Sequence, residues 1–185
     1  MTSWIALAVI AAAPPPPGAA GAGAGGACLA EQAHYRLKAD ADYTASLVPA
    51  LHHASEVSRL YLRVSSPERS WWFVFGATQG YGGLFLEPVS DPTLAEAKES
   101  GPRPLSRSEE RPLQVFPMTR KLDELDVAPQ PGQPAPDALF IPQLGPALWY
   151  SPSALSGDPD AKAENMPRSV FVRVGCGPAN GPAYP

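Results

Sequence analysis

The stretch that decides the fold reads VSRLYLRVSSPERSWWFVFGATQGYGGLFLE and covers residues 57–87. Residues 57–64 alternate between apolar and polar side chains, which is the pattern of a half-buried strand. The aromatic run 71–75 is typical of a central strand that is covered on both faces. Segments rich in Ser, Pro and Gly separate these runs from a third run at 84–87, which Pro88 is expected to end. We therefore predict an antiparallel β-meander.

Shorter apolar runs on either side of the meander predict additional strands. They lie at residues 35–37, 114–116, 139–141, 147–150 and 169–174. The chain contains 24 prolines, which disfavour long helices and mark long loops. The predicted fold is mainly β, an antiparallel meander that forms a small sandwich or partial barrel with Pro-rich loops. The alternative is a compact α+β domain with a helix over residues 46–58.

Composition limits the domain count and the classes of partner. A chain of 185 residues with 44% hydrophobic and 17% charged residues is long enough for one core, but not for two. The net charge is −4, and the basic residues are scattered singly. Nucleic acid is therefore not an expected partner, because no basic cluster is available to neutralise a row of phosphates.

The N-terminal segment has the character of an export signal. Residues 1–27 carry no charged side chain, and residues 5–13 form an apolar run that is too short to span a bilayer. Small residues that suit signal cleavage follow. We predict a signal peptide with a Pro/Gly/Ala-rich tract at 1–27 and a single exported domain at 28–185, periplasmic or secreted, with no transmembrane helix in the mature form. The alternative is a disordered tail on a cytosolic protein.

The two cysteines stand near the two ends of the predicted domain. Cys28 follows small residues, and Cys176 follows the last predicted strand. Paired cysteines in an exported chain predict a disulfide. The small residues before Cys28 also resemble a bacterial lipobox weakly, which would make the protein an outer-membrane or inner-membrane lipoprotein.

Candidate catalytic and metal-binding residues do not form a known constellation. His52 and Glu56 would share one helical face beside His53, but a third metal ligand is missing. Serines occur in the segment 65–72 without the Gly-x-Ser-x-Gly motif of a nucleophile elbow. We predict no catalytic site, no metal and no cofactor. A small hydrolase-like periplasmic enzyme that uses these residues is the rival hypothesis.

Strand alternation predicts one recognition surface. The side of the meander opposite its aliphatic residues would carry aromatic side chains together with arginines, a composition typical of recognition surfaces. The predicted site consists of Arg59, Tyr61, Arg63, Trp72, Phe85 and Arg173. The leading hypothesis is a non-enzymatic bacterial envelope protein that binds an envelope protein or a small ligand through this face. The alternatives are that the Pro-rich segment 101–137 covers the face, or that the protein is a lipid-anchored structural protein.

Overall fold

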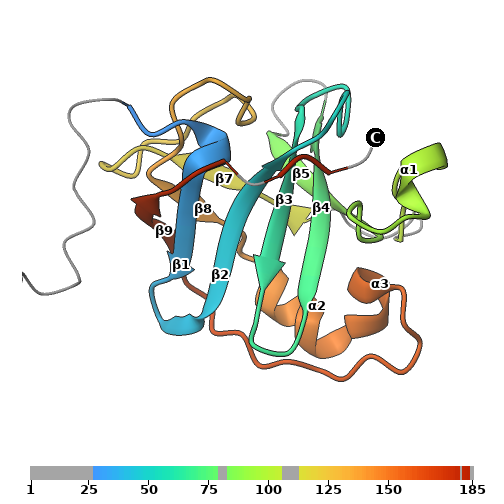
Figure 1. Ribbon diagram of the computed structural model, residues 1–185. Coiled ribbons are helices and arrows are strands. Elements are labelled where there is room, and N and C mark those ends of the chain that lie inside the picture. The colour runs from blue at the N-terminus through green and yellow to red at the C-terminus, as the bar shows by residue number, and fades with distance from the viewer. Residues whose placement is uncertain (1–26, 79–82, 106–112, 180, 184–185) are drawn as a thin grey trace, which may run out of the picture.

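A computed structural model of the chain describes residues 27–78, 83–105, 113–179 and 181–183 (Figure 1). Within these ranges, antiparallel strands form one sheet in the order β6-β5-β4-β3-β2-β1-β9-β8-β7. The strands are β1 (Ala33–Leu37), β2 (Asp40–Pro49), β3 (Leu60–Ser65), β4 (Ser70–Ala77), β5 (Leu84–Val89), β6 (Leu113–Gln114), β7 (Phe116–Met118), β8 (Ala138–Phe140) and β9 (Val170–Cys176). The helical segments are η1 (Ala30–Gln32), α1 (Ala97–Ser100), α2 (Leu144–Tyr150) and α3 (Pro152–Ser156).

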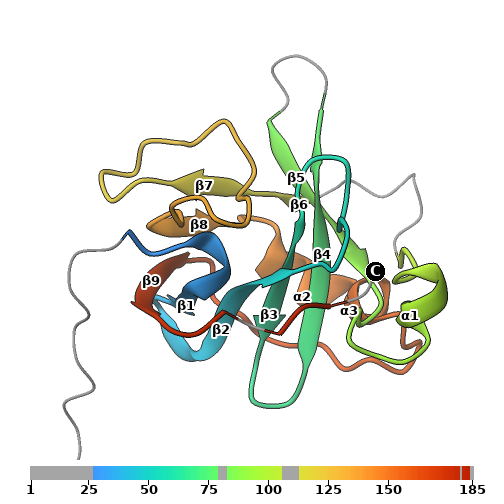
Figure 2. The same ribbon diagram turned by 45° about the horizontal axis from the view of Figure 1, so that its top comes forward.

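The sheet is nearly closed on itself. β6 and β7 stand at opposite ends of the strand order, yet Val115 alone separates them along the chain. The two edges of the sheet therefore meet at Val115, which is fully buried. Figure 2 shows the strands curling round a common interior. We call this nearly closed sheet the barrel, and closure removes most of the exposed strand edge. The prediction of an antiparallel β fold is confirmed.

The predicted meander corresponds to β3, β4 and β5, which pair in sequence with antiparallel registers such as Leu62 with Phe73. β5 continues through Pro88 to Val89, so the prediction that the strand ends at Pro88 is wrong. The Pro88 carbonyl accepts a hydrogen bond from the Leu105 amide at 2.9 Å, on the side away from β4. The missing amide proton of Pro88 therefore removes no bond to β4, and pairing extends to Val89.

Two elements differ from the sequence predictions. The helix considered over residues 46–58 is absent, because residues 40–49 form β2 with Tyr43 and Leu47 facing the core. Residues 147–150, predicted as strand, belong to α2. Leu144 and Leu148 are spaced four apart and both buried, so one face of α2 packs against the barrel interior.

Two apolar clusters lie on opposite sides of the sheet. The larger one fills the barrel and includes Trp71, and α2 and α3 close it at the lower end in Figure 1. The smaller one, which we call the outer cluster, lies on the outside and consists of Val48, Ala50, Tyr61, Trp72, Val89 and Ala183. Trp71 is 2% exposed and Trp72 is 4% exposed. The prediction that β4 is covered on both faces is confirmed.

Cys28 and Cys176 form the predicted disulfide. Their Cα atoms are 5.9 Å apart, with a sequence separation of 148. The bond joins the segment before η1 to the end of β9. The predicted signal peptide covers residues 1–27, and the structure describes only Ala27 of these. The glycine-rich turn at 79–82 and residues 106–112 also lie outside the described residues.

Candidate functional site

Three of the six predicted site residues meet on the outer side of the meander. The ring of Tyr61 stands edge-on to that of Trp72 with centroids 6.4 Å apart, and the Arg63 guanidinium lies 5.5 Å from the Trp72 ring centroid. Arg63 also donates hydrogen bonds from Nε and Nη2 to Ser70 Oγ at 3.2 and 3.1 Å. Both aromatic rings are buried, and Trp72 Nε1 has no hydrogen-bond partner among the described residues. Of the three, only Arg63 is exposed.

The C-terminal segment supplies part of the cover over these rings. Ala183 donates its amide to the Pro49 carbonyl at 2.8 Å and accepts from the Leu51 amide at 2.9 Å. The chain beyond β9 therefore crosses the outer face of the barrel, as the dark red trace in Figure 1 shows. The fully described loop 119–137 lies instead at the upper end of the barrel in that view. Residues 119–137 of the Pro-rich segment 101–137 therefore do not cover the face that carries Tyr61 and Trp72, contrary to the alternative considered from the sequence.

Phe85 and Arg59 lie apart from this group. Phe85 packs across Gly76 of β4, where an added Cβ would come within 2.3 Å of the Phe85 ring. This close approach explains why a glycine stands within β4. Arg59 is exposed just before β3, and its Nε donates to the His52 carbonyl at 3.2 Å.

Arg173 lies on the inner side of the sheet, so the prediction that it shares the outer face with Tyr61 is wrong. It pairs across strands with Tyr35, which is 1% exposed, and its guanidinium forms an ion pair with Asp137. Alternation alone does not predict which face of β9 is buried, because both faces carry apolar side chains. Val170, Val172 and Val174 lie on one face, and Phe171 and Arg173 lie on the other. Phe171 fills the core, and Arg173 follows it to the same side.

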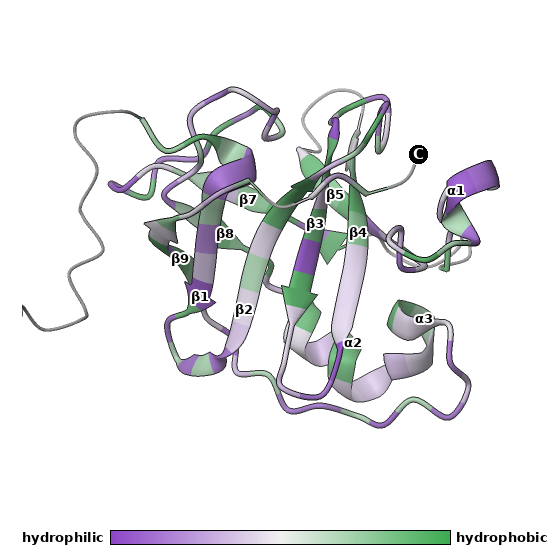
Figure 3. Cartoon of the chain, viewed as in Figure 1, coloured by the Kyte–Doolittle hydropathy of each residue, from purple (hydrophilic) through white to green (hydrophobic). Residues whose placement is uncertain are grey.

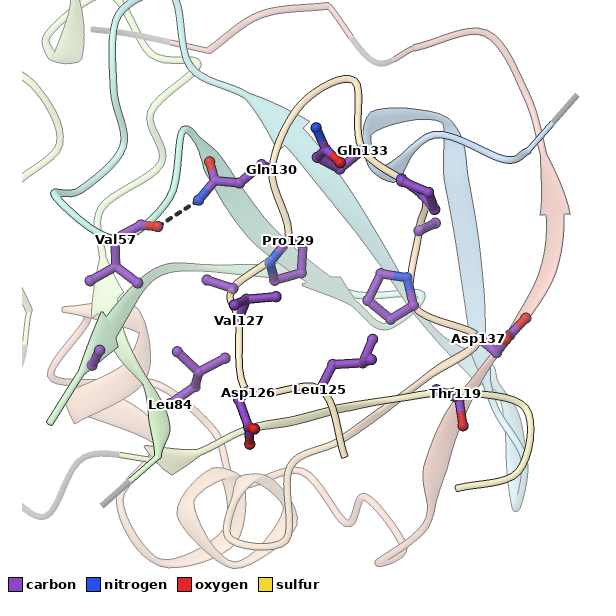
Figure 4. Close-up of a pocket in the computed structure, with 15 residues that line it drawn as sticks. Val57, Leu84, Thr119, Leu125, Asp126, Val127, Pro129, Gln130, Gln133 and Asp137 are labelled. Atoms are coloured by element: carbon purple, nitrogen blue, oxygen red, sulfur yellow. Dashed lines mark hydrogen bonds between the residues drawn. The ribbon is translucent and has the colours of Figure 1, made fainter. Parts of the chain in front are cut away.

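A cleft of about 840 Å³ opens between the loop 119–137 and the ends of β4 and β5. Its walls are mainly apolar, and Figure 4 shows Leu84, Leu125 and Val127 gathered in the middle of the view. The carboxylate of Asp126 lies at the margin. No pattern in the sequence indicates this cleft, because its walls come from segments far apart in the chain.

One wall of the cleft is fixed to the segment before β3. Gln130 donates from Nε2 to the Val57 carbonyl at 2.6 Å, the bond drawn in Figure 4. Its Oε1 accepts from the Arg59 amide at 3.2 Å. Ser58 is 2% exposed and donates from Oγ to the Pro129 carbonyl at 2.6 Å. These bonds hold the Pro-rich loop at a fixed distance from β3.

The other wall is fixed to the N-terminal segment and β9. The Ala135 amide donates to the Cys28 carbonyl at 2.7 Å, and the Ala30 amide donates to the Gln133 carbonyl at 2.9 Å. Arg173 donates from Nη1 to the Ala135 carbonyl at 3.2 Å. The disulfide between Cys28 and Cys176 therefore anchors the N-terminal segment whose backbone bonds this wall.

Tyr35 closes the barrel beneath the loop. Its hydroxyl donates to the Pro136 carbonyl at 3.0 Å. Burial raises the pKa of Tyr35 well above its usual range, the Arg173 charge opposes this, and the Asp137 charge adds to it. The phenol is therefore neutral and remains a hydrogen-bond donor throughout the physiological pH range.

The residues of the rival enzyme hypothesis are not assembled into a catalytic arrangement. His52 and His53 are exposed, and the Ser65 and Ser70 hydroxyls bond to each other at 2.8 Å. Among the described residues, no histidine side chain bonds a serine hydroxyl, and no three metal-ligating side chains cluster. Nor does that part of the chain contain a helix long and apolar enough to cross a membrane.

Comparison of the chain with protein-family models, with curated proteins and with solved structures found no match.

Proposed function

We propose that this protein is a non-enzymatic, exported bacterial envelope domain that binds a small apolar molecule in the cleft at the upper end of the barrel. The observation that carries the proposal is the cleft itself. Its volume of about 840 Å³ lies in the range of small-molecule sites, about 300–1,000 Å³. Predominantly apolar walls with a few polar groups at the margin are also typical of such sites.

The chemistry of the wall favours a small molecule over an extended peptide. An added peptide strand needs a row of free backbone donors and acceptors. The wall contains Pro129, Pro134 and Pro136, which have no amide proton, and the Ala135 amide is already bonded to the Cys28 carbonyl. The wall therefore offers shape and apolar contact rather than strand pairing.

The disulfide supports export. Stable disulfides form in oxidising compartments, and the apolar run at residues 5–13 suits a secretion signal. The Cys28 sulfur is bonded to Cys176, which leaves no thiol there for a lipid thioether. A periplasmic or secreted location is therefore favoured over a lipoprotein. Cell fractionation and the mass of the mature N-terminus test this part of the proposal.

Ligand binding is tested with the neutral apolar dye N-phenyl-1-naphthylamine. Val127 lines the cleft and is 72% exposed, so Val127→Asp places a charge in the cleft with little effect on folding. The matched control is Leu122→Asp, because Leu122 is 64% exposed in the same loop but outside the cleft.

We expect the dye to bind with enhanced fluorescence, Val127→Asp to weaken binding about tenfold, and Leu122→Asp to leave it within about twofold. Equal losses in the two variants, or no saturable dye binding, would refute the cleft as the binding site. Circular dichroism melts of both variants check that the fold is unchanged.

A further inference from the structure

The cleft at the upper end of the barrel offers few hydrogen-bond donors, and this restricts the chemistry of its ligand. Pro129, Pro134 and Pro136 of its wall have no amide proton. Other amides of the wall already donate to carbonyls of the protein, namely those of Thr119, Leu125, Gln133, Ala135 and Asp137. A ligand group that needs several donors, such as a carboxylate or a phosphate, would lose its hydration here without replacement.

The charged side chains that line the cleft are carboxylates. Asp126 and Asp137 belong to its walls, and among the described residues no lysine, arginine or histidine does. Arg120 and Lys121 belong to the same loop but do not line the cleft. A positively charged ligand group is therefore favoured here over a negatively charged one.

Of the two carboxylates, Asp126 is the one without a protein partner. Asp137 forms an ion pair with Arg173, and its Oδ2 accepts from the Arg120 amide at 2.9 Å. Asp126 is exposed and has no hydrogen-bond or ion-pair partner in the described part of the chain. Its charge is therefore available to a ligand.

The loop that supplies Asp126 brings apolar and charged groups together over a short distance. Figure 3 shows hydrophobic and hydrophilic residues in turn along residues 119–137. Leu125 and Val127 lie in the middle of the cleft in Figure 4, and the Asp126 carboxylate lies at its margin. A ligand can therefore place its apolar part in the cleft and keep its charged group at the solvent edge, where the charge stays partly hydrated.

We infer that the ligand of this cleft is a cationic amphiphile, an apolar molecule that carries one ammonium group, and that the ammonium group lies beside Asp126. The inference rests on the proposed function, because it names the chemical class of the ligand for the same cleft. Asp126 is open to solvent, so its contribution is that of an exposed ion pair and amounts to about threefold in affinity. The scarcity of donors acts in the same direction, because it disfavours the anionic analogue.

The test displaces bound N-phenyl-1-naphthylamine with protonated decylamine, 1-decanol and decanoate, which share a straight chain of the same length. All are used below the concentrations at which they form micelles. The variant is Asp126→Asn, which keeps the size of the side chain and removes its charge. The matched control is Glu124→Gln, because Glu124 is also exposed in the same loop but does not line the cleft.

We expect decylammonium to displace the dye at the lowest concentration and decanoate at the highest. Asp126→Asn should weaken decylammonium about threefold and leave decanol within about 1.5-fold. Glu124→Gln should leave both ligands within about 1.5-fold. If Asp126→Asn is unstable in circular dichroism melts, the ranking of the ligands on the wild-type protein decides the matter.

Failure of this inference can be told apart from failure of the proposed function. Without saturable dye binding, the cleft is not the binding site, and the cationic ligand is refuted with it. Saturable dye binding with decanoate as strong as decylammonium would overturn the cationic ligand alone. Equal weakening of decylammonium in Asp126→Asn and Glu124→Gln would also overturn it, because it would show only diffuse charge attraction.

Discussion

Truncation of Trp72 tests whether the outer cluster is a packed second core. A buried tryptophan removes about 150–250 Å² from water, which is worth about 4–6 kcal/mol at about 25 cal/mol per Å². Measured losses for Trp→Ala are about 3–5 kcal/mol, because the cavity collapses in part. Trp72 is 4% exposed and Trp71 is 2% exposed. We therefore expect both Trp72→Ala and Trp71→Ala to lower the free energy of unfolding by about 3–5 kcal/mol.

A second substitution at the same position separates packing from hydrogen bonding. Trp72 Nε1 is buried without a partner among the described residues, which costs about 1–3 kcal/mol. Trp72→Phe removes that donor and keeps most of the ring, so its net loss should be under about 1 kcal/mol. Guanidinium chloride unfolding, followed by far-UV circular dichroism, measures all three variants. A Trp72→Ala loss below about 1 kcal/mol would contradict the packed cluster, and a Trp72→Phe loss above about 2 kcal/mol would contradict the unpaired donor.

Three other perturbations have defined outcomes. Cys28→Ser and Cys176→Ser together remove a disulfide that closes a loop with a sequence separation of 148. The free energy of unfolding should therefore fall by up to about 5 kcal/mol in the chain-entropy model. A loss under about 1 kcal/mol in denaturant melts would contradict this prediction. Ser58→Ala leaves a buried carbonyl without its donor and should cost about 1–3 kcal/mol in the same melts, together with weaker dye binding; unchanged dye binding would show that Ser58 does not support the cleft wall. Burial raises the pKa of Tyr61 from 10.0 to about 12, so the stability it contributes is present below pH 10.0 and lost as pH rises through about 12. Ultraviolet titration of the folded protein should accordingly show delayed phenolate formation, and complete ionisation of all tyrosines near pH 10.0 without unfolding would disprove this.

Alternation along the chain predicted those features of the fold that depend on residues close together in the sequence. The meander and the opposite directions of Trp71 and Trp72 follow from the period of two in a strand. So does the shared face on which Tyr61 and Arg63 both contact Trp72. β2 carried a signal of the same kind, with Tyr43, Ala45 and Leu47 alternating with polar residues, but its small and polar composition makes the strand weak by propensity. Pairing with β1 and β3 supplies the missing stabilisation.

The sequence by itself determined the antiparallel β class, the pairing of the only two cysteines and the two-faced aromatic strand, because these depend on local periodicity and composition. The tertiary structure alone decided the rest. Closure at Val115, the crossing of the outer face by the C-terminal segment and the cleft under the Pro-rich loop all join residues distant in the chain. Arg173 shows the reason most clearly: its face depends on whether Phe171 or the valines of β9 fill the core, and that choice depends on the volume left by the other strands.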